Sequence, residues 1–112
     1  MPSTNTVVSH PSAAETTSGQ SGGFNVSGAS EAIVFFNVTA ASGTVPTLDI
    51  KVQISADGVT WHDEGTTFTQ VIVAITPAVK KLTNIGAWLR FVWTIAGTTP
   101  SFTFTLTSIL KS

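Results

Sequence analysis

The sequence predicts an all-β fold, namely an antiparallel β-sandwich or small barrel with jelly-roll or immunoglobulin-like connections and an extended N-terminal arm. Short runs of β-branched and aromatic residues recur along the chain, and most of them alternate between apolar and polar side chains. Glycine, proline and aspartate separate these runs, as turns between strands require. No window longer than about ten residues has the three- and four-residue apolar spacing of an amphipathic helix.

The chain has 112 residues, which suits one domain, and only 10% of them are charged. Soluble domains usually contain about 25% charged residues, so serine and threonine must supply much of the polar surface here. The formal charge is −1, with five basic residues. Because this charge gives no positive field for a phosphate backbone, we expect no nucleic-acid partner and no membrane partner.

The absence of cysteine excludes disulfides, zinc–thiolate sites and cysteine nucleophiles. No basic segment precedes an apolar run at the N-terminus, and no apolar run approaches the roughly 18 residues of a membrane helix. We therefore expect neither a signal peptide nor a membrane anchor, and we expect synthesis in the cytoplasm.

Residues 1–30 are rich in serine, threonine and glycine and contain few large apolar side chains. Such a composition buries too little surface to offset the loss of backbone entropy. We predict that residues 1–30 form a largely extended arm and that residues 31–112 form the β-sandwich domain. Two segments of the arm, residues 6–10 and the stretch around Phe24, have the composition of strands that add to a neighbouring sheet.

Residues 31–40 are apolar on both faces and end at the glycine- and proline-containing loop 41–46. This pattern predicts a central strand that is covered on two sides. Residues 47–55 alternate strictly and predict a half-buried strand. The side chains of this strand that we expect to point inward are Leu48, Ile50, Val52 and Ile54.

Further strands are predicted at residues 66–75, 87–96 and 101–110, and the connection 77–86 has room for a short edge strand. The last two predicted strands alternate, so each has one apolar face. Their side chains that we expect to point inward are Leu89, Phe91, Trp93, Ile95, Phe102, Phe104 and Leu106.

Residues 54–70 combine a turn dipeptide, a tryptophan, a histidine and two adjacent acids. The pair Asp57-Gly58 favours a tight turn that reverses the chain. A metal site would need His62 and the two acids after it to converge, but neighbours on an extended chain point to alternate faces. The acids also lack the spacing of a calcium-binding loop. We predict a hairpin corner here, with no metal and no cofactor.

The residues present do not support catalysis. A glycosidase needs two carboxylates that face each other across a cleft, and so few ionisable groups leave little with which to tune their pKa values. No glycine-flanked serine follows a strand into a helix, as a hydrolase nucleophile requires. We therefore expect no catalytic residues and no enzymatic activity.

The three tryptophans differ in their predicted environments. Trp93 lies on the apolar face of its strand and is expected in the core. Trp61 follows the predicted turn, and Trp88 shares a face with Arg90, so these three residues are candidates for an exposed interface. An alternative is that Trp61 and Trp88 stack on sugar rings in a carbohydrate-binding module.

Without the arm, about 80 residues remain, a size at which one core often supplies only about 3–5 kcal/mol. Disulfides are absent and a metal is not expected. Association of identical chains is the remaining means of stabilisation, and a surface with few charges suits it.

Two segments, LDIKVQISADGVTWHDEGTTFTQV and LRFVWTIAGTTPSFTFTLTSIL, carry a resemblance to a known group of proteins. In order, they contain an S-x-D-G-x-x-W turn, an F-T-Q strand, an L-R-x-x-W strand and a G-T-x-P-S-F-T-F hairpin. This pattern, which covers residues 48–110, resembles that of small virion proteins of tailed bacteriophages.

The resemblance implies a capsid decoration, or head-stabilising, protein: a small β domain, commonly a trimer, that clamps neighbouring major capsid subunits on the outside of the head. Synthesis would then take place in the cytoplasm of the host, and a tail or neck role stays open. In such proteins the N-terminal arm typically reaches onto the capsid surface or a neighbouring protomer. The expected capsid-binding residues are Pro2, Ser3, Thr4, Asn5, Thr6, Val7, Val8, Ser9 and His10.

Overall fold

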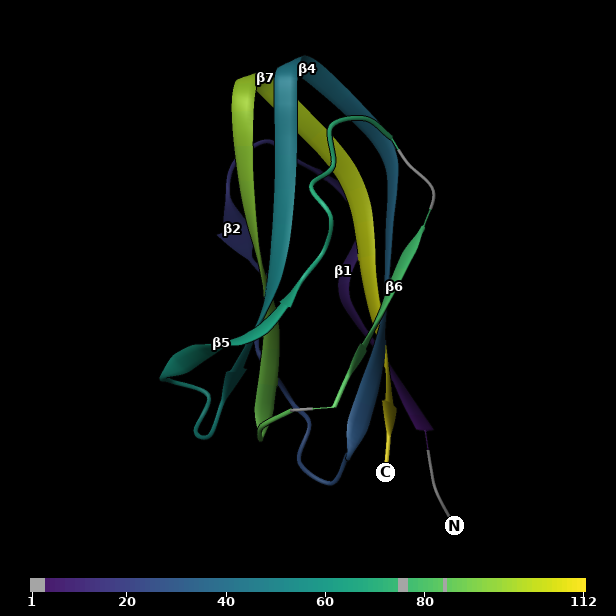
Figure 1. Ribbon diagram of the computed structural model, residues 1–112, viewed down its shortest axis with the longest axis vertical. Helices are drawn as coiled ribbons and strands as arrows, with labels where there is room; N and C mark the ends of the chain where they lie inside the picture. The colour runs from purple at the N-terminus through teal and green to yellow at the C-terminus, as the bar shows by residue number, and fades with distance from the viewer. Residues whose placement is uncertain (1–3, 75–76, 84) are drawn as a thin grey trace.

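The computed structural model describes residues 4–74, 77–83 and 85–112, which form one antiparallel β-sheet (Figure 1). The predicted all-β, sandwich-like fold is confirmed. Within the described residues, no helix has the length and apolarity that a membrane crossing requires. The strands are β1 (Thr4–Glu15), β2 (Gly19–Gln20), β3 (Phe24–Asn25), β4 (Glu31–Ser55), β5 (Trp61–Thr67), β6 (Ala78–Leu82) and β7 (Trp88–Lys111).

The sheet folds over itself into two layers because its two longest strands bend together. β4 pairs with β7 along almost its whole length, from Glu31 opposite Lys111 to Ser55 opposite Trp88. Both ribbons curve over at the top of Figure 1. The first layer therefore contains β1, the C-terminal half of β7, the N-terminal half of β4 and β6, and the second contains β2, β3, the other halves of β7 and β4, and β5.

The predicted loop at residues 41–46 is one of these bends, and the other lies between the strands predicted at residues 87–96 and 101–110. Each of these two pairs of predicted strands is therefore one continuous strand. The bends are built from residues with positive φ, namely Gly43, Val45, Gly97 and Thr99. Gly97 has φ +121°, and a Cβ atom there would lie 2.8 Å from the carbonyl oxygen of Val45. Only glycine permits this close approach of the two bent strands.

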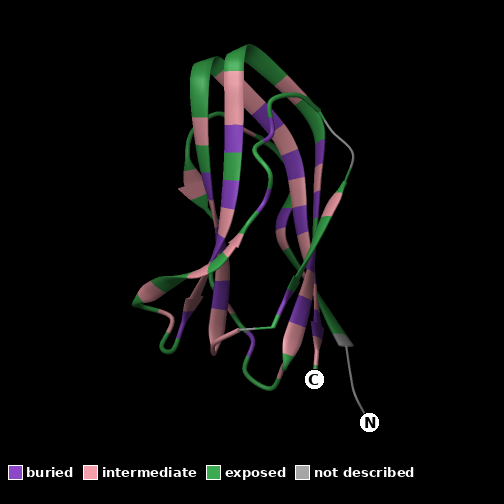
Figure 2. Ribbon diagram, viewed as in Figure 1, coloured by how far each residue is buried: buried purple, intermediate pink, exposed green. Residues whose placement is uncertain are grey.

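The core lies between the layers, and the inward residues predicted for the alternating strands largely occupy it (Figure 2). Trp93 is buried as predicted, whereas Ile54 and Ile95 are half-buried. Phenylalanine and leucine side chains of both layers interdigitate there. The largest fully buried side chains are Phe36, Phe91, Phe102, Phe104, Leu48, Leu82, Leu89 and Leu106.

The strand predicted at residues 66–75 is wrong in its position. β5 begins at Trp61, directly after the predicted turn, and ends at Thr67. Beyond it, Phe68 and Val71 are buried, and their backbone amides donate to the carbonyls of Ile50 and Leu48 at 3.0 and 2.9 Å. This apolar run therefore contacts β4 at isolated residues and does not pair with it as a continuous strand. The last predicted residue, at position 75, lies outside the described residues.

The described residues of the predicted arm are extended, but they pair with β7 of the same chain. β1 runs antiparallel to the C-terminal half of β7, and β2 and β3 run beside its N-terminal half. The strands predicted at residues 6–10 and around Phe24 are therefore present. A segment with few apolar residues can form an edge strand, because such a strand makes backbone hydrogen bonds on one side and buries only a few side chains.

The N-terminal half of β4 is covered on one face only. Its inward residues are buried, including Val34 and Phe36, whereas Phe35 on the other face is 45% exposed. The predicted coverage of residues 31–40 on both sides is thus wrong within this chain.

Candidate functional site

The predicted capsid-binding residues lie on β1, at one edge of the first layer. Pro2 and Ser3 are outside the described residues. Residues 4–8 pair in continuous register with residues 107–111 of β7, and the register shifts on either side of His10. Among the described residues, β7 is the partner of β1, so the other edge of β1 presents backbone groups without a strand partner.

His10 differs from the other predicted arm residues because it anchors β1 between the two layers. Its side chain is buried, and Nδ1 lies 2.8 Å from the carbonyl oxygen of Phe104. Nε2 lies 3.0 Å from a carboxylate oxygen of Glu15. The imidazole stacks on the ring of Phe104 at 4.0 Å and meets Trp93 edge-on at 5.2 Å. His10 is therefore part of the fold and is not available to a partner.

The two edges of the first layer differ in charge. β1 carries one acid, Glu15 at its C-terminal end, and no lysine or arginine. β6 forms the opposite edge and carries Lys80 and Lys81, both exposed. Lys80 pairs with inward-facing Val34, so an exposed charge lies on the inward side of the β6 edge, a feature that discourages pairing with another strand. On β1 the one comparable charge is Glu15, which pairs with buried Phe102 at the C-terminal end, so residues 4–14 lack this protection.

Trp61, Trp88 and Arg90, predicted as an exposed interface, are brought together on the outer face of the second layer. Each is half-buried. The guanidinium carbon of Arg90 lies 4.4 Å from the ring centroid of Trp61, within the range of a cation–π interaction. The two indole rings also approach Gly23, where a Cβ atom would lie 2.7 Å from Trp61 and 3.9 Å from Trp88. A glycine in this loop is required for the tryptophans to lie there.

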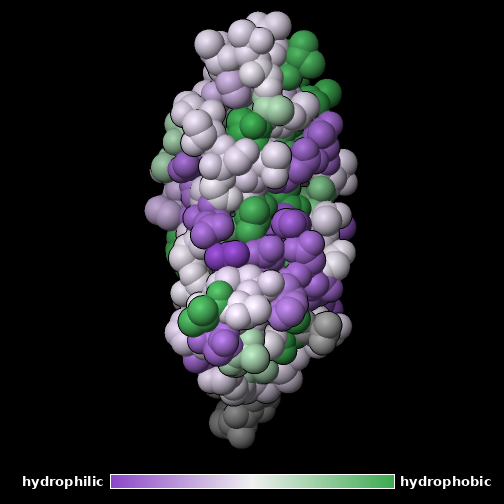
Figure 3. Space-filling model, turned by 90° about the vertical axis from the view of Figure 1, so that its left-hand side faces the viewer, coloured by the Kyte–Doolittle hydropathy of each residue, from purple (hydrophilic) through white to green (hydrophobic). Residues whose placement is uncertain are grey.

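A chain of polar side chains continues from the tryptophans across the same face (Figure 3). Arg90 Nε donates to Gln53 Oε1 at 2.8 Å, and Gln53 Nε2 donates to Asp63 Oδ1 at 2.9 Å. Lys51 Nζ lies 3.1 Å from the same oxygen of Asp63. The hydrogen bond from Gln53, followed by that from Lys51, holds the pKa of Asp63 below its ordinary value.

The grouping of Lys51, Gln53 and Asp63 with Arg90 on this face was not predicted from the sequence. The strict alternation of residues 47–55 does contain a signal, since it places the polar residues of that strand on one side. The alternation does not reveal that β5 and β7 are the neighbouring strands, and these strands supply Asp63 and Arg90.

The corner predicted at Asp57-Gly58 is confirmed as the turn between β4 and β5. Asp57 Oδ1 accepts hydrogen bonds from the backbone amides of Val59 at 2.9 Å and Thr60 at 3.0 Å. Gly58 has φ +79°, and its amide donates to Ser55 Oγ at 2.8 Å. The backbone hydrogen bonds from Thr60 and Val59, with one from the Ser55 hydroxyl, hold the pKa of Asp57 below its ordinary value. The Asp57 carboxylate therefore stabilises the turn through these hydrogen bonds.

Metal binding finds no support in residues 4–74, 77–83 and 85–112, where no group of three or more His, Cys, Asp or Glu side chains is arranged to hold an ion. Of the residues considered above for a metal site, His62 is exposed, and Asp63 bonds to Lys51 and Gln53. Glu64 instead bonds to the backbone amide and hydroxyl of Thr66. The three side chains therefore do not converge.

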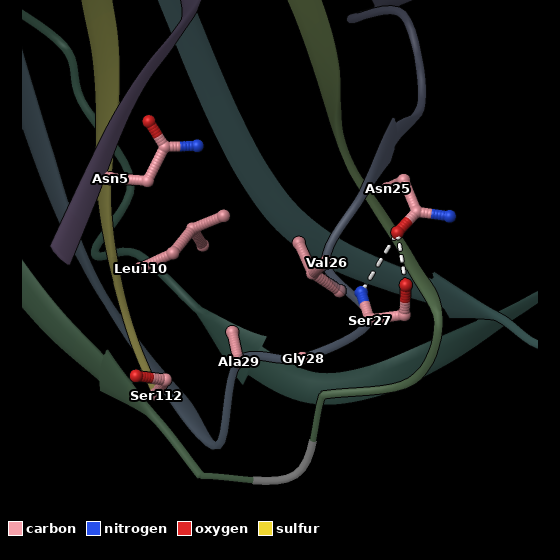
Figure 4. A pocket seen from close by; sticks show the side chains of 8 residues that line it. All are labelled: Asn5, Asn25, Val26, Ser27, Gly28, Ala29, Leu110 and Ser112. Carbon is pink, nitrogen blue, oxygen red and sulfur yellow. Dashed lines mark hydrogen bonds between the residues drawn. The ribbon is translucent and has the colours of Figure 1, made fainter. Parts of the chain in front are cut away.

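A shallow pocket of about 220 Å³ lies where β1, the end of β7 and the loop after β3 meet (Figure 4). Val26 and Leu110 are buried beneath it, and Asn25 Oδ1 accepts hydrogen bonds from the amide and hydroxyl of Ser27. Pockets for small molecules usually measure about 300–1,000 Å³. This pocket therefore suits a side chain of a protein partner better than a separate ligand.

The fold of this chain occurs in phage and viral proteins. No protein-family model matches the sequence, and no curated protein sequence matches it. Among solved structures, the SPBc2 prophage-derived protein YomS is 14% identical with a TM-score of 0.58, and the match covers all of this chain and 96% of that one. The PBSX exported protein XepA is 12% identical with a TM-score of 0.68, over 95% of this chain and 36% of that one.

A chain in the structure of the infectious bursal disease virus Gx strain is also similar, with 15% identity, a TM-score of 0.57 and coverage of 98% of this chain and 32% of that one. This chain thus spans about a third of the XepA and virus chains but nearly all of YomS. At these identities the structural similarity shows a shared fold. The resemblance of residues 48–110 to phage virion proteins is consistent with that fold.

Proposed function

We propose that this protein is a non-enzymatic structural protein of a virion, which binds the outer surface of a tailed-phage capsid and clamps neighbouring major capsid subunits. The sequence pattern over residues 48–110 and the fold shared with a prophage-derived protein support a phage role. The proposal includes a homo-oligomer, expected to be a trimer. Linked copies on a repeating shell convert individually weak contacts into avid binding.

The observation that carries the proposal is the edge of β1 that has no strand partner among the described residues, and residues 4–14 carry no lysine, arginine or acid. A strand of a major capsid subunit would add to this edge through backbone hydrogen bonds. Because β1 is already ordered against β7, docking would cost less conformational entropy than the folding of a free arm.

Deletion of residues 1–10 would test this contact poorly, since it would also remove the buried anchor His10. A lysine at Asn5, an exposed residue whose register partner is the buried Leu110, would instead place an inward-directed charge at the β1 edge, as Lys80 does at β6. The matched control is Gln20→Lys, which adds the same charge on exposed β2 of the other layer.

The assay is co-sedimentation with capsids of the phage that encodes this chain, prepared without it. Loss of two or more backbone hydrogen bonds, at about 0.5–1.5 kcal/mol each, predicts about tenfold weaker binding of the Asn5→Lys variant. The Gln20→Lys variant should bind as the unmodified chain does. Equal binding of all three proteins would refute the role of β1, and binding to purified tails but not heads would assign a tail or neck role instead.

A second candidate function is carbohydrate binding at a virion or cell surface, which the clustering of Trp61 and Trp88 favours. The polar chain beside them offers alternating donors and acceptors, from Arg90 to Lys51, that suit the hydroxyl groups of a sugar. Sugar binding would quench or shift tryptophan emission, and Trp88→Ala would abolish the response in a protein with an unchanged circular dichroism spectrum. A flat titration across a glycan panel would eliminate this candidate.

A further inference from the structure

The outer face of the second layer contains a depression of about 300 Å³ at the end of the polar chain that runs from Arg90 to Lys51. It lies over β4, beside the end of β5. Asp49 and Lys51 lie on the solvent side of β4, because they alternate with the buried Leu48 and Ile50. The residues that line the depression are Asp49, Ile50, Lys51, Thr67, Phe68 and Thr94.

The lining of this depression offers both kinds of hydrogen-bonding group. The carboxylate oxygens of Asp49 accept from Gln70 Nε2 at 2.9 and 3.2 Å, and each oxygen keeps a second lone pair. Thr94 is the register partner of Asp49, and Thr67 is that of Lys51. Both threonines are exposed, and their hydroxyls have no hydrogen-bond partner among the described residues. A ligand whose hydroxyl groups both donate and accept would match this lining.

The same face continues from the depression along β7 toward the tryptophans. Thr94, Val92, Arg90 and Trp88 lie on one side of β7, because they are two residues apart. The six residues from Trp88 to Thr94 span about 20 Å, at about 3.4 Å each. Val92 is half-buried and gives an apolar spot on which the carbon–hydrogen face of a sugar ring can pack. We call this surface the polar face; its residues are Asp49, Lys51, Gln53, Asp63, Thr67, Arg90, Val92 and Thr94.

The charges of the polar face are balanced. Lys51 and Arg90 are basic, and Asp49 and Asp63 are acidic, so the face carries no net charge. An acidic polymer would bring its charges close to Asp49 and Asp63, and a basic polymer would bring its charges close to Lys51 and Arg90. A neutral ligand avoids both kinds of repulsion.

We propose that the polar face binds a neutral oligosaccharide, with one sugar unit in the depression at Asp49 and further units along β7 toward Trp88. Asp49 accepts hydrogen bonds from sugar hydroxyls, and Lys51 and Thr94 donate to them. This inference rests on the carbohydrate-binding candidate function and adds an anchor about 20 Å from the tryptophans. Because β1 belongs to the other layer, a bound oligosaccharide would leave its edge free for a capsid.

The test is a chemical-shift titration of the isotope-labelled full chain. The neutral probes are cellotetraose, xylotetraose, maltotetraose and mannotetraose, and the acidic probe is tetragalacturonate. We expect saturable shifts of the backbone amides of Lys51, Thr67 and Thr94 with at least one neutral tetrasaccharide. Tetragalacturonate should cause none.

Two matched pairs of variants test the anchor. Asp49→Ala should weaken binding about tenfold, because it removes a charged acceptor, whereas Glu31→Ala removes a carboxylate from the first layer and should leave the affinity unchanged. Thr94→Val and Thr105→Val each exchange a hydroxyl for a methyl group on β7, which keeps the shape of the strand surface. Only Thr94→Val should weaken binding, about threefold, since Thr105 lies in the first layer.

The outcomes separate this inference from the functions on which it rests. Binding that Asp49→Ala and Thr94→Val leave unchanged, or shifts confined to the surroundings of Trp61 and Trp88, would overturn the inference and leave carbohydrate binding in place. Equally tight binding of tetragalacturonate would overturn the neutral ligand class. No shift with any tetrasaccharide would refute carbohydrate binding as well, and capsid co-sedimentation would still decide the structural role.

Discussion

Replacement of His10 by alanine tests whether β1 belongs to the folded core. The imidazole is 6% exposed, lies 2.8 Å from the carbonyl oxygen of Phe104 and stacks on its ring at 4.0 Å. Loss of the hydrogen bond costs about 1 kcal/mol, and loss of the aromatic pair costs about 1 kcal/mol more. The cavity left beside Trp93 adds a further penalty of about 1 kcal/mol. The expected destabilisation of His10→Ala is therefore about 3 kcal/mol.

Urea unfolding, followed by tryptophan emission, measures this difference. With a slope of about 2 kcal/mol/M for a protein of this size, the midpoint of His10→Ala should fall by about 1.5 M. The control is Ser12→Ala, an exposed position on the same strand, which should change stability by less than about 0.5 kcal/mol. If His10→Ala had as small an effect as the control, β1 would be a detachable arm in solution and the assignment of His10 as its anchor would be refuted.

Three further predictions concern the bends, the turn and the tryptophan face. Gly97→Ala should lower the thermal midpoint, because it forces a Cβ atom to 2.8 Å from a carbonyl at φ +121°, whereas Gly22→Ala, with nothing within 4 Å, should be nearly neutral. Asp57→Ala should lower the urea midpoint at pH 7. Because folding lowers the pKa of Asp57, its contribution is present above the ordinary value of 3.8 and should vanish as the pH falls through the lowered pKa, where variant and unmodified chain converge. Arg90→Ala should shift tryptophan emission to longer wavelength by exposing Trp61, and an unchanged spectrum would contradict the observed cation–π contact.

Alternation along the chain predicted which side chains form the core and where the chain turns. Trp93 and Phe104 are buried, and Asp57-Gly58 forms the corner after β4, because period-two patterning and turn chemistry are local properties. The prediction failed at residues 66–75, where an apolar run contacts the core at isolated points without continuing as a strand. A short apolar run does not reveal whether a neighbouring strand is in reach.

The candidate surfaces were predicted only in part for the same reason. Trp88 and Arg90 were predicted to share one face of a strand, but their grouping with Trp61 depends on the pairing of β4 with both β5 and β7. The exposed side of residues 31–40 was not predicted, because the sequence does not say whether a second layer of the same chain covers both sides of a strand.

The sequence by itself determined the all-β class, the alternation of core side chains and the Asp57-Gly58 corner, since each depends on residues within a few positions of one another. Only the tertiary structure decided that β4 and β7 bend together into two layers and that residues 4–15 complete an edge of the first. These features depend on pairings between distant segments, and for a polar segment such as β1 the partner strand supplies the backbone hydrogen bonds that its own composition does not encode.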